Sequence, residues 1–584
     1  MKKSLFSLMA IVLSFILFLP LGYASTSGHI GLLTVSESVN NTEYGGTADL
    51  YLVLKPGNGR IFIDSFPLSK IDTQITMRFA SEVACDLLEK DCSNYDFFYT
   101  ITAASAIVGG PSAGAAATVL TIALLDNQAL YNDTIMTGTI NSGNLIGPVA
   151  GVPAKAIAAQ NAGYKRVLIP RWDVANNTPD GNLSIQVIPI STLEEALYYF
   201  TGKNYSKSQT LDGNFSYSEE YSRIMRQVTI DLCTKYGRIS DDSLILPNLT
   251  NYGINVSNSS QDNFVLAQDA IRSGAYYSAA SFCFGGNVKI KNALMKNFTN
   301  SELQIDYAKL LSNITEFRNK LESNSNSLST ISQLETYMIV AERLSEAKSI
   351  LSEMNPENIS AYQLAYAYER FNTAIIWSRF YELPGQKFMM DKELLRIVCA
   401  KKLAEAEERL NYLELYYPKV EIREELRTAY DYYKEEDYAL CIFTSSKIKA
   451  DSDIVLSAIF VPEEDLDRLF DEKINAAQRV ISKQAHANIF PILGYSYFEY
   501  ANTLKDTDTY SSLLYAEYSL EMSNIDMYFK KREPLSIEIT PGYDLSSVIT
   551  PAFTSGFFIG VLLTLSALLL ILKFNKVNSK KRKR

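Results

Sequence analysis

The sequence predicts three structural parts in order along the chain. Strand-like runs alternate with helical runs over residues 25–203, which is typical of an α/β domain. The 3.6-residue period dominates residues 216–533, which predicts an all-α region built as helical hairpins or as a helical bundle. Residues 552–572 form a 21-residue run without a charged side chain, and this length suits a single C-terminal transmembrane helix.

Each element of the α/β domain follows from its local pattern. β-Branched and aromatic residues alternate or run together in the predicted strands, at 29–38, 49–66, 95–108, 165–170 and 180–190. Apolar residues at helical spacing predict helices at 72–91, 111–127, 155–163 and 191–202. The helix at 111–127 is almost entirely apolar, so we expect it to be buried.

The second part contains a weakly recurring helix–turn–helix pattern. It occurs at 267–282, 429–446 and 500–519, each time as a helix with small residues, a short polar turn with a tyrosine nearby, and a second helix. The pattern resembles helical-hairpin repeats of the tetratricopeptide kind without matching their motif. An irregular helical bundle is an equally good interpretation.

The two ends of the chain predict its location. Residues 1–24 read as a secretory signal peptide with cleavage after Ala24; an uncleaved N-terminal anchor is the alternative. Residues 534–551 read as a linker, and the tail 573–584 carries seven basic residues and no acid, which predicts a cytoplasmic tail. A nuclear-localisation signal would explain the tail alone but not the apolar run before it. We therefore expect a single-pass cell-membrane protein whose body lies outside the cytoplasm.

Glycosylation sequons, cysteines and charge agree with that location. N-x-[ST] sequons are frequent, and six cysteines, an even number, suit an oxidising compartment. Pairing of nearest neighbours predicts three disulfides, Cys85–Cys92, Cys233–Cys283 and Cys399–Cys441. The net charge is −10 despite the basic tail, so the body is acidic and a nucleic-acid partner is not expected.

Histidine is scarce enough to exclude whole classes of active site. The chain has two histidines, His29 and His486, so it contains no HExxH zinc motif and no histidine-rich metal cluster. We predict no metal and no cofactor. A Ser-His-Asp triad would depend on one of two isolated imidazoles, so an enzyme with this sequence needs another general base.

Two segments offer a nucleophile and a base. Ser112 lies in Gly110-Pro111-Ser112-Ala113-Gly114 at the start of an apolar helix, where backbone N–H groups and the positive end of the helix dipole can stabilise an oxyanion. Lys155 stands among small and apolar residues at the start of another helix. Burial and the helix dipole there would lower the pKa of its amine, as a general base requires. The alternatives are a serine that only caps its helix and a lysine that extends to the surface.

Taken together, these segments resemble the Lon protease family. Thr137, which is followed by Gly138, lies 25 residues after Ser112, and Lys155 lies 43 residues after it. This is the spacing associated with that family's supporting threonine and catalytic lysine. A glycine-rich turn, the AA and AG pairs after Lys155 and a V-L-I-P strand follow in the same order. The segment 56–61 and the helix after it also look like the start of that domain. The resemblance covers about 170 residues of the predicted domain 25–203.

The resemblance implies a Lon-type proteolytic domain with a Ser/Lys dyad. Ser112 would be the nucleophile and Lys155 the general base, and Thr137 would orient the lysine. Backbone N–H groups around Gly110 and Ala113 would stabilise the oxyanion. The implied function is a serine endopeptidase acting on polypeptide substrates.

Departures from the family limit what is implied. Many Lon proteases have an acid three residues before the serine and an acid directly after Thr-Gly, whereas this chain has Gly109 and Thr139 at these positions. The lysine that is common two residues before the catalytic lysine is replaced by Pro153. No GxxxxGK[ST] motif occurs, so the ATPase module is missing and the substrates should be unfolded or flexible chains cleaved without ATP. The overall plan resembles archaeal membrane-anchored Lon-like serine proteases.

Two other functions remain open on the sequence alone. The chain could be a binding or scaffold protein that keeps the fold with a silent site, or it could cleave itself or a neighbour. The helical region could present substrates on a tyrosine-rich concave face or act as a spacer from the membrane. Formation of a homo-oligomer is open, because Lon domains form rings but this chain lacks their motor.

Overall fold

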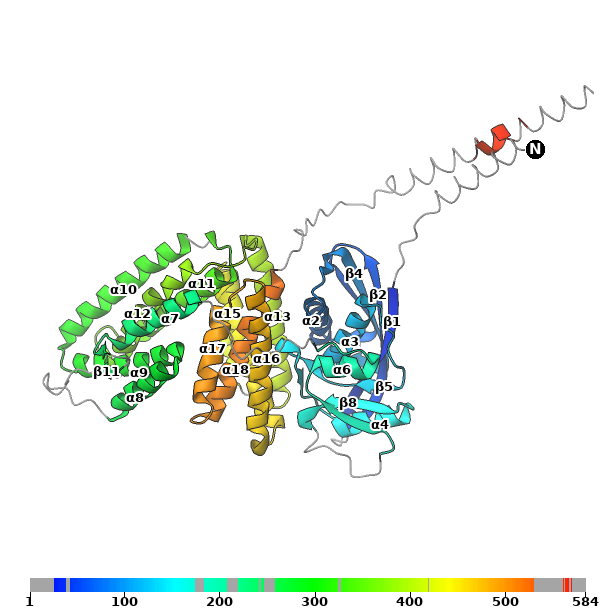
Figure 1. Ribbon diagram of the computed structural model, residues 1–584, viewed down its shortest axis with the longest axis horizontal. Helices are drawn as coiled ribbons and strands as arrows, with labels where there is room; N and C mark the ends of the chain where they lie inside the picture. Colours follow the sequence, from blue (N-terminus) through cyan, green and yellow to red (C-terminus); the bar gives the residue numbers. More distant parts are fainter. Residues whose placement is uncertain are drawn as a thin grey trace, which may run out of the picture. The chain divides into compact units, whose positions relative to one another are not determined.

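A computed structural model describes most of the chain up to residue 529, in two regions that lie side by side (Figure 1). The described ranges are 26–37, 43–173, 183–206, 219–240, 243–245, 258–323, 327–418 and 420–529, with seven positions between 560 and 569. The predicted signal peptide and the predicted linker lie outside them, as does most of the predicted transmembrane segment. Within these ranges no helix combines the length and the apolar character needed to cross a membrane.

The first region is built on a mixed seven-stranded sheet in the order β3-β4-β2-β1-β5-β8-β9. Its strands are β1 (Thr26–Glu37), β2 (Glu43–Pro56), β3 (Ile61–Ser69), β4 (Tyr95–Val108), β5 (Thr134–Met136), β8 (Arg166–Pro170) and β9 (Gln186–Ile190). Strands β1, β5, β8 and β9 are parallel, whereas β2 runs antiparallel to both β1 and β4. The α/β class predicted from the sequence is confirmed.

Helices cover both faces of this sheet because its central strands are apolar on both sides. Leu32, Met136 and Leu168 pack with α2 (Ile71–Leu87), α3 (Gly114–Leu125) and α6 (Leu193–Thr201). Their sequence neighbours Leu33, Ile135 and Val167 point to the opposite face and pack with α4 (Val152–Asn161). Alternation along a strand therefore places α3 and α4 on opposite faces of one sheet.

Sequence periodicity located most of these elements but not all of them. The predicted strand 49–66 is two strands, since residues after Pro56 form a turn in which Gly59 has a φ of 75°. The predicted helix at 111–127 begins with a short 3₁₀ turn, η2 (Pro111–Ala113), before α3. The three-residue β5 and the small hairpin of β6 (Thr139–Ile140) and β7 (Ile146–Gly147) were not predicted, because segments this short carry no readable period.

The second region is almost entirely helical, as predicted. Its helices are α7 (Glu219–Cys233), α8 (Asn258–Ser273), α9 (Tyr276–Met295), α10 (Asn300–Ser323), α11 (Ile331–Glu353), α12 (Ala361–Trp377), α13 (Lys392–Glu414), α14 (Ile422–Lys434), α15 (Tyr438–Phe460), α16 (Leu466–His486), α17 (Ile492–Leu504) and α18 (Thr509–Ser523). A short strand pair after α7, β10 (Arg238–Ser240) and β11 (Ser243–Ile245), corrects the all-α prediction. Gly237 follows α7 there, and the two strands pair over three residues each, too short a stretch to change the 3.6-residue period of the region.

The three recurring segments are helical hairpins, α8–α9, α14–α15 and α17–α18. Local residues define their turns: Gly274 ends α8 at a φ of 79°, which glycine adopts without strain. Asp437 and Asp508 cap α15 and α18 by accepting hydrogen bonds from the N–H groups of Leu440 and Ser511. The predicted pairing of the cysteines is also confirmed, with disulfides Cys85–Cys92, Cys233–Cys283 and Cys399–Cys441.

Candidate active site

Ser112 lies in a sharp turn between β4 and the buried helix α3. Gly110 has a φ of 98°, which favours glycine, and Pro111 opens the 3₁₀ turn η2 that carries the serine. The backbone N–H of Gly110 donates a 3.0 Å hydrogen bond to Asp72 Oδ2 on the first turn of α2. The turn is therefore held by its own backbone geometry and by a neighbouring helix, while Ser112 itself is half-buried.

Helix α3 behind the serine is buried along its whole length. Its first residue, Gly114, packs tightly: a Cβ atom there would lie 3.0 Å from side-chain atoms of both Thr76 and Ile140. A glycine at this position lets the serine turn approach α2 and β6 closely. The tight packing fixes where the serine lies relative to the end of the sheet.

Thr137 follows β5, the short parallel strand between β1 and β8. Its N–H donates to the carbonyl of Leu168 on β8 (3.1 Å), which continues the parallel pairing by one residue. The next residue, Gly138, donates from its N–H to the carbonyl of Ser112 (3.0 Å) and accepts from the N–H of Ala115 (3.1 Å). Gly138 is thus hydrogen-bonded to the backbone both at Ser112 and just after it, at Ala115.

Lys155 lies one turn into α4, on the other face of the sheet. Gly151 caps this helix in the left-handed region, at a φ of 64°, and accepts a hydrogen bond from the N–H of Lys155 (2.9 Å). The Lys155 side chain is 2% exposed, and its Nζ donates a 3.2 Å hydrogen bond to Thr137 Oγ1. The alternative of a lysine that extends to the surface is therefore wrong.

The structure brings the predicted site residues to one place beyond the end of β5. Ser112, with Gly110 and Ala113 in the same turn, comes from one face of the sheet, and Lys155 comes from the other. Thr137 joins them, because it receives the lysine hydrogen bond and its own hydroxyl donates to the Ser112 carbonyl at 3.4 Å. The N–H of Gly110 is already bonded to Asp72 and Pro111 has no N–H, so the N–H groups of this turn that could donate to a substrate oxygen belong to Ser112 and Ala113.

Neither histidine takes part in this constellation. His29 is on β1 and 43% exposed, and its Nε2 lies 2.7 Å from Asp49 Oδ1. His486 ends α16, where its ring bonds the carbonyl of Ser482. A lysine-based site is consistent with both positions.

Comparison with known proteins relates the α/β region to one protease family. Residues 81–200 match the C-terminal proteolytic domain of Lon protease (S16). The match includes Ser112, Thr137 and Lys155. The chain is 29% identical over 155 residues to a Lon protease of Phenylobacterium zucineum and 32% identical over 130 residues to one of Paraburkholderia phytofirmans. A Lon protease of Syntrophus aciditrophicus is 41% identical over 64 residues.

These likenesses concern one part of each protein. The aligned segments make up 24%, 21% and 11% of this chain and 19%, 16% and 8% of the respective relatives. The likeness supports a serine protease of the Lon type in the α/β region.

The positions that depart from the family have local partners of their own. Thr139 is buried and its hydroxyl donates to Asn141 Oδ1 at 3.2 Å. At Gly109, the space that a side chain would need is taken by the side chain of Lys70, since a Cβ atom there would lie 2.6 Å from it. Asp72, Asn141 and their partners were missed by sequence reasoning, since no local motif marks them.

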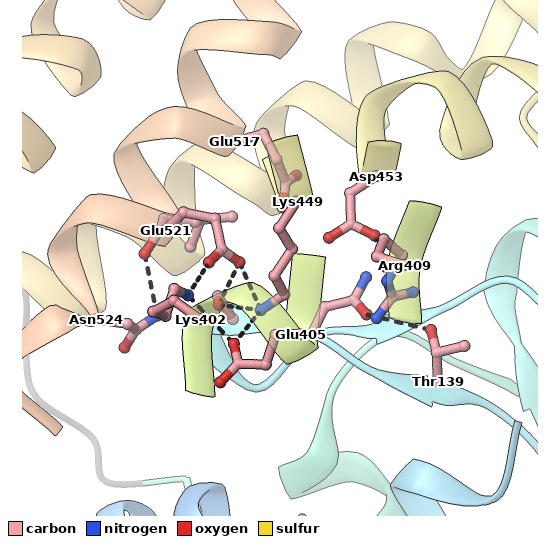
Figure 2. Close-up of polar contacts among 12 residues, drawn as sticks. Thr139, Lys402, Glu405, Arg409, Lys449, Asp453, Glu517, Glu521 and Asn524 are labelled. Atoms are coloured by element: carbon pink, nitrogen blue, oxygen red, sulfur yellow. Dashed lines mark hydrogen bonds and ion pairs between the residues drawn. The ribbon is translucent and has the colours of Figure 1, made fainter. Parts of the chain in front are cut away.

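Among the described residues, one group of side chains has the spacing of a metal site: Asp453, Glu517 and Glu521, all buried in the helical region. Lysines already face two of these carboxylates. Lys402 and Lys449 lie 2.8 and 2.9 Å from Glu521, and Lys473 is ion-paired with Glu517. The group is a salt-bridge network (Figure 2), and the cations that its carboxylates require are supplied by the chain itself.

Proposed function

We propose that this chain is a serine endopeptidase that uses Ser112 and Lys155 as a catalytic dyad. The observation that carries the proposal is the path from Lys155 Nζ through the Thr137 hydroxyl to the turn of Ser112, within a segment similar to Lon proteolytic domains. Burial favours the neutral form of an amine, and a neutral amine can accept a proton. Thr137 would hold that amine towards the serine.

The proposed reaction has two stages, acylation and deacylation, and Lys155 accepts one proton and gives it back in each. Ser112 Oγ attacks the carbonyl carbon of the substrate while its proton passes to Lys155 Nζ. The peptide C–N bond then breaks, and Lys155 gives the proton to the leaving amine. Water hydrolyses the acyl–serine ester, again with Lys155 as the proton carrier. The backbone N–H groups of Ser112 and Ala113 would face the oxyanion, since Pro111 has no N–H.

We further propose that the protein acts without ATP on unfolded or flexible polypeptides, anchored to the membrane by residues 552–572 and facing away from the cytoplasm. This part rests on the sequence: no GxxxxGK[ST] motif occurs in it, and the apolar run is followed by a basic tail.

The test is cleavage of casein by the full chain, purified with detergent, with and without ATP and Mg²⁺. We expect cleavage that ATP does not change and that Ser112→Ala and Lys155→Met each abolish. Lys165→Met is the matched control, because Lys165 is an exposed lysine of the same domain. Equal cleavage by wild type and Ser112→Ala would overturn the dyad. No cleavage by a folded wild type would favour the silent scaffold.

A further inference from the structure

Helix α13 of the helical region packs against α2 and contacts the segment that joins Thr137 to Lys155. We propose that Arg409 and Tyr412 on this helix are positioning residues of the proteolytic site, so that the helical region is part of the protease and is not only a spacer. The inference rests on the proposed function. Its evidence is that residues 138–151, which connect the two halves of the site, are held by buried side chains of the helical region at three points.

The first point is Asn141, three residues after Gly138. Arg409 Nη2 donates a 2.9 Å hydrogen bond to Asn141 Oδ1, the same oxygen that accepts from Thr139. Arg409 is 3% exposed, and its Nε lies 3.1 Å from Asp453 Oδ1. A buried guanidinium fixed by a carboxylate thus supplies the polar anchor next to the family position where an acid is missing.

The second point is Ser142, whose hydroxyl bonds two members of the salt-bridge network of the helical region. Ser142 Oγ donates to Glu521 Oε1 at 2.5 Å and accepts from Lys449 Nζ at 3.3 Å. Burial alone would raise the pKa of Glu521, but Lys402 and Lys449 outweigh it and hold that pKa well below its usual range. The acceptor for Ser142 is therefore an ionised carboxylate, which makes a strong hydrogen bond.

The third point is Ala150, at the start of the helix that carries the lysine. Its backbone N–H donates to Tyr412 Oη at 3.2 Å, and Tyr412 is 7% exposed. Ala150 precedes Gly151, whose carbonyl accepts the hydrogen bond from the Lys155 N–H. The hydroxyl of Tyr412 therefore helps to set where α4 begins, one turn before the proposed base.

The same helix also closes against the serine turn. Pro111 and Ile140 from the α/β region and Glu408 and Arg409 from α13 line a void of about 10 Å³, which is room for at most one water molecule. α13 is thus packed beside both the nucleophile turn and the lysine loop. A spacer needs none of these buried, directional contacts, whereas a positioning helix needs all of them.

The test uses the full chain in detergent with casein as substrate and a fluorophosphonate to titrate reactive serines. Tyr412→Phe removes only the hydroxyl, and Tyr430→Phe is the matched control, because Tyr430 bonds Glu407 on α13 away from the site. We expect kcat per titrated site to fall about five- to tenfold in Tyr412→Phe with KM within twofold. Tyr430→Phe should keep the wild-type kcat.

A second pair of variants tests the Arg409 anchor. Asn141→Val removes the acceptor and should lower kcat per titrated site about tenfold, whereas Asn141→Asp keeps an oxygen for Arg409 and should restore kcat to within threefold of wild type. Wild-type kcat in Tyr412→Phe and Asn141→Val would overturn the inference while leaving the dyad intact. So would fewer titrated sites at an unchanged kcat per site, since that marks a purely structural role. Activity that survives Ser112→Ala would overturn the proposed function itself, and the inference with it.

Discussion

The two regions of the molecule bury lysines in opposite ways. In the α/β region, Lys155 is 2% exposed and its Nζ donates to the hydroxyl of Thr137. In the helical region, Lys449 is equally buried but lies 2.9 Å from Glu521. Burial lowers the pKa of the Lys449 amine, but Glu521 and Glu405 outweigh that effect and raise it above its usual value.

The difference shows that burial alone does not decide what a lysine does. Beside carboxylates, a buried lysine is held as a cation and serves as a structural ion-pair partner. A buried lysine that bonds a hydroxyl next to a serine has a partner that tolerates the neutral amine, which is the form that can accept a proton.

The largest expected effect comes from exchanging lysine for arginine at one buried site of each kind. Lys155→Arg should lower kcat/KM for casein by at least about a thousandfold, because a guanidinium stays protonated at any working pH. Lys473→Arg in the helical region keeps a cation opposite Glu517 and should leave kcat/KM within about threefold of wild type. Initial rates of casein cleavage, measured on folded protein, compare the two variants. Similar losses of kcat/KM in both variants would remove the contrast between the two lysine sites.

Removing the lysine charge should lower the stability of the fold far more at Lys473 than at Lys155. Lys473→Met strands the buried carboxylate of Glu517 and should lower the free energy of unfolding by about 3–5 kcal/mol. Lys473→Met combined with Glu517→Gln should recover a large part of that loss. Lys155→Met removes a donor from the neutral hydroxyl of Thr137 and should change stability much less. Urea denaturation followed by circular dichroism measures all three, and equal losses at both lysines would contradict the account.

Buried carboxylates should respond to pH according to their partners. Burial raises the pKa of Glu499 to about 7, against the weaker opposing effect of the hydrogen bonds from Ser278. The folded state therefore holds this proton more tightly than the unfolded state, so its contribution to stability is present below about pH 4.5 and is lost as pH rises to about 7, by roughly 3 kcal/mol.

Glu499→Gln should remove that loss, so that it is more stable than wild type at pH 8 and similar at pH 5. Glu521 has the opposite sign: its lowered pKa gives stability above its unfolded pKa that is lost only in acid. Unfolding free energies measured across pH 4–8 test Glu499, and their extension down to about pH 2 tests Glu521. A wild-type curve that rises steadily from pH 5 to 8, with Glu499→Gln parallel to it, would show that the sign assigned to Glu499 is wrong.

The smallest predicted effect concerns the hydroxyl that receives the lysine. Thr137→Val keeps the shape of the side chain and removes the acceptor for Lys155 Nζ, so kcat should fall about tenfold. Thr137→Ser retains the hydroxyl and should stay within about threefold of wild type. If Thr137→Val matched wild type in kcat, the hydroxyl would have no part in orienting the lysine.

Local sequence patterns predicted the parts of this molecule that local chemistry determines. The spacing of Ser112, Thr137 and Lys155 indicated one site, and the structure places Thr137 in contact with both partners. Nearest-neighbour pairing predicted the disulfides because each pair closes a local segment. Helical periodicity and polar turns predicted the hairpins for the same reason.

The features that sequence patterns did not predict depend on contacts between distant parts of the chain. Asn141 and Arg409 are 268 residues apart, and nothing local to either residue indicates the other. Tyr412 belongs to a helix that reads as an ordinary amphipathic segment, yet its hydroxyl bonds the N–H of Ala150 just before the lysine helix. The short strand β5, which places Thr137, was invisible because three residues show no period.

Covalent labelling tests directly whether Lys155 activates Ser112. The full chain is treated with a fluorophosphonate, digested and mapped by mass spectrometry, beside Lys155→Met and the control Lys165→Met. The account predicts an adduct on Ser112 in wild type and in Lys165→Met, and none above background in Lys155→Met. An adduct on a different serine, or equal labelling of Ser112 with and without Lys155, would contradict it.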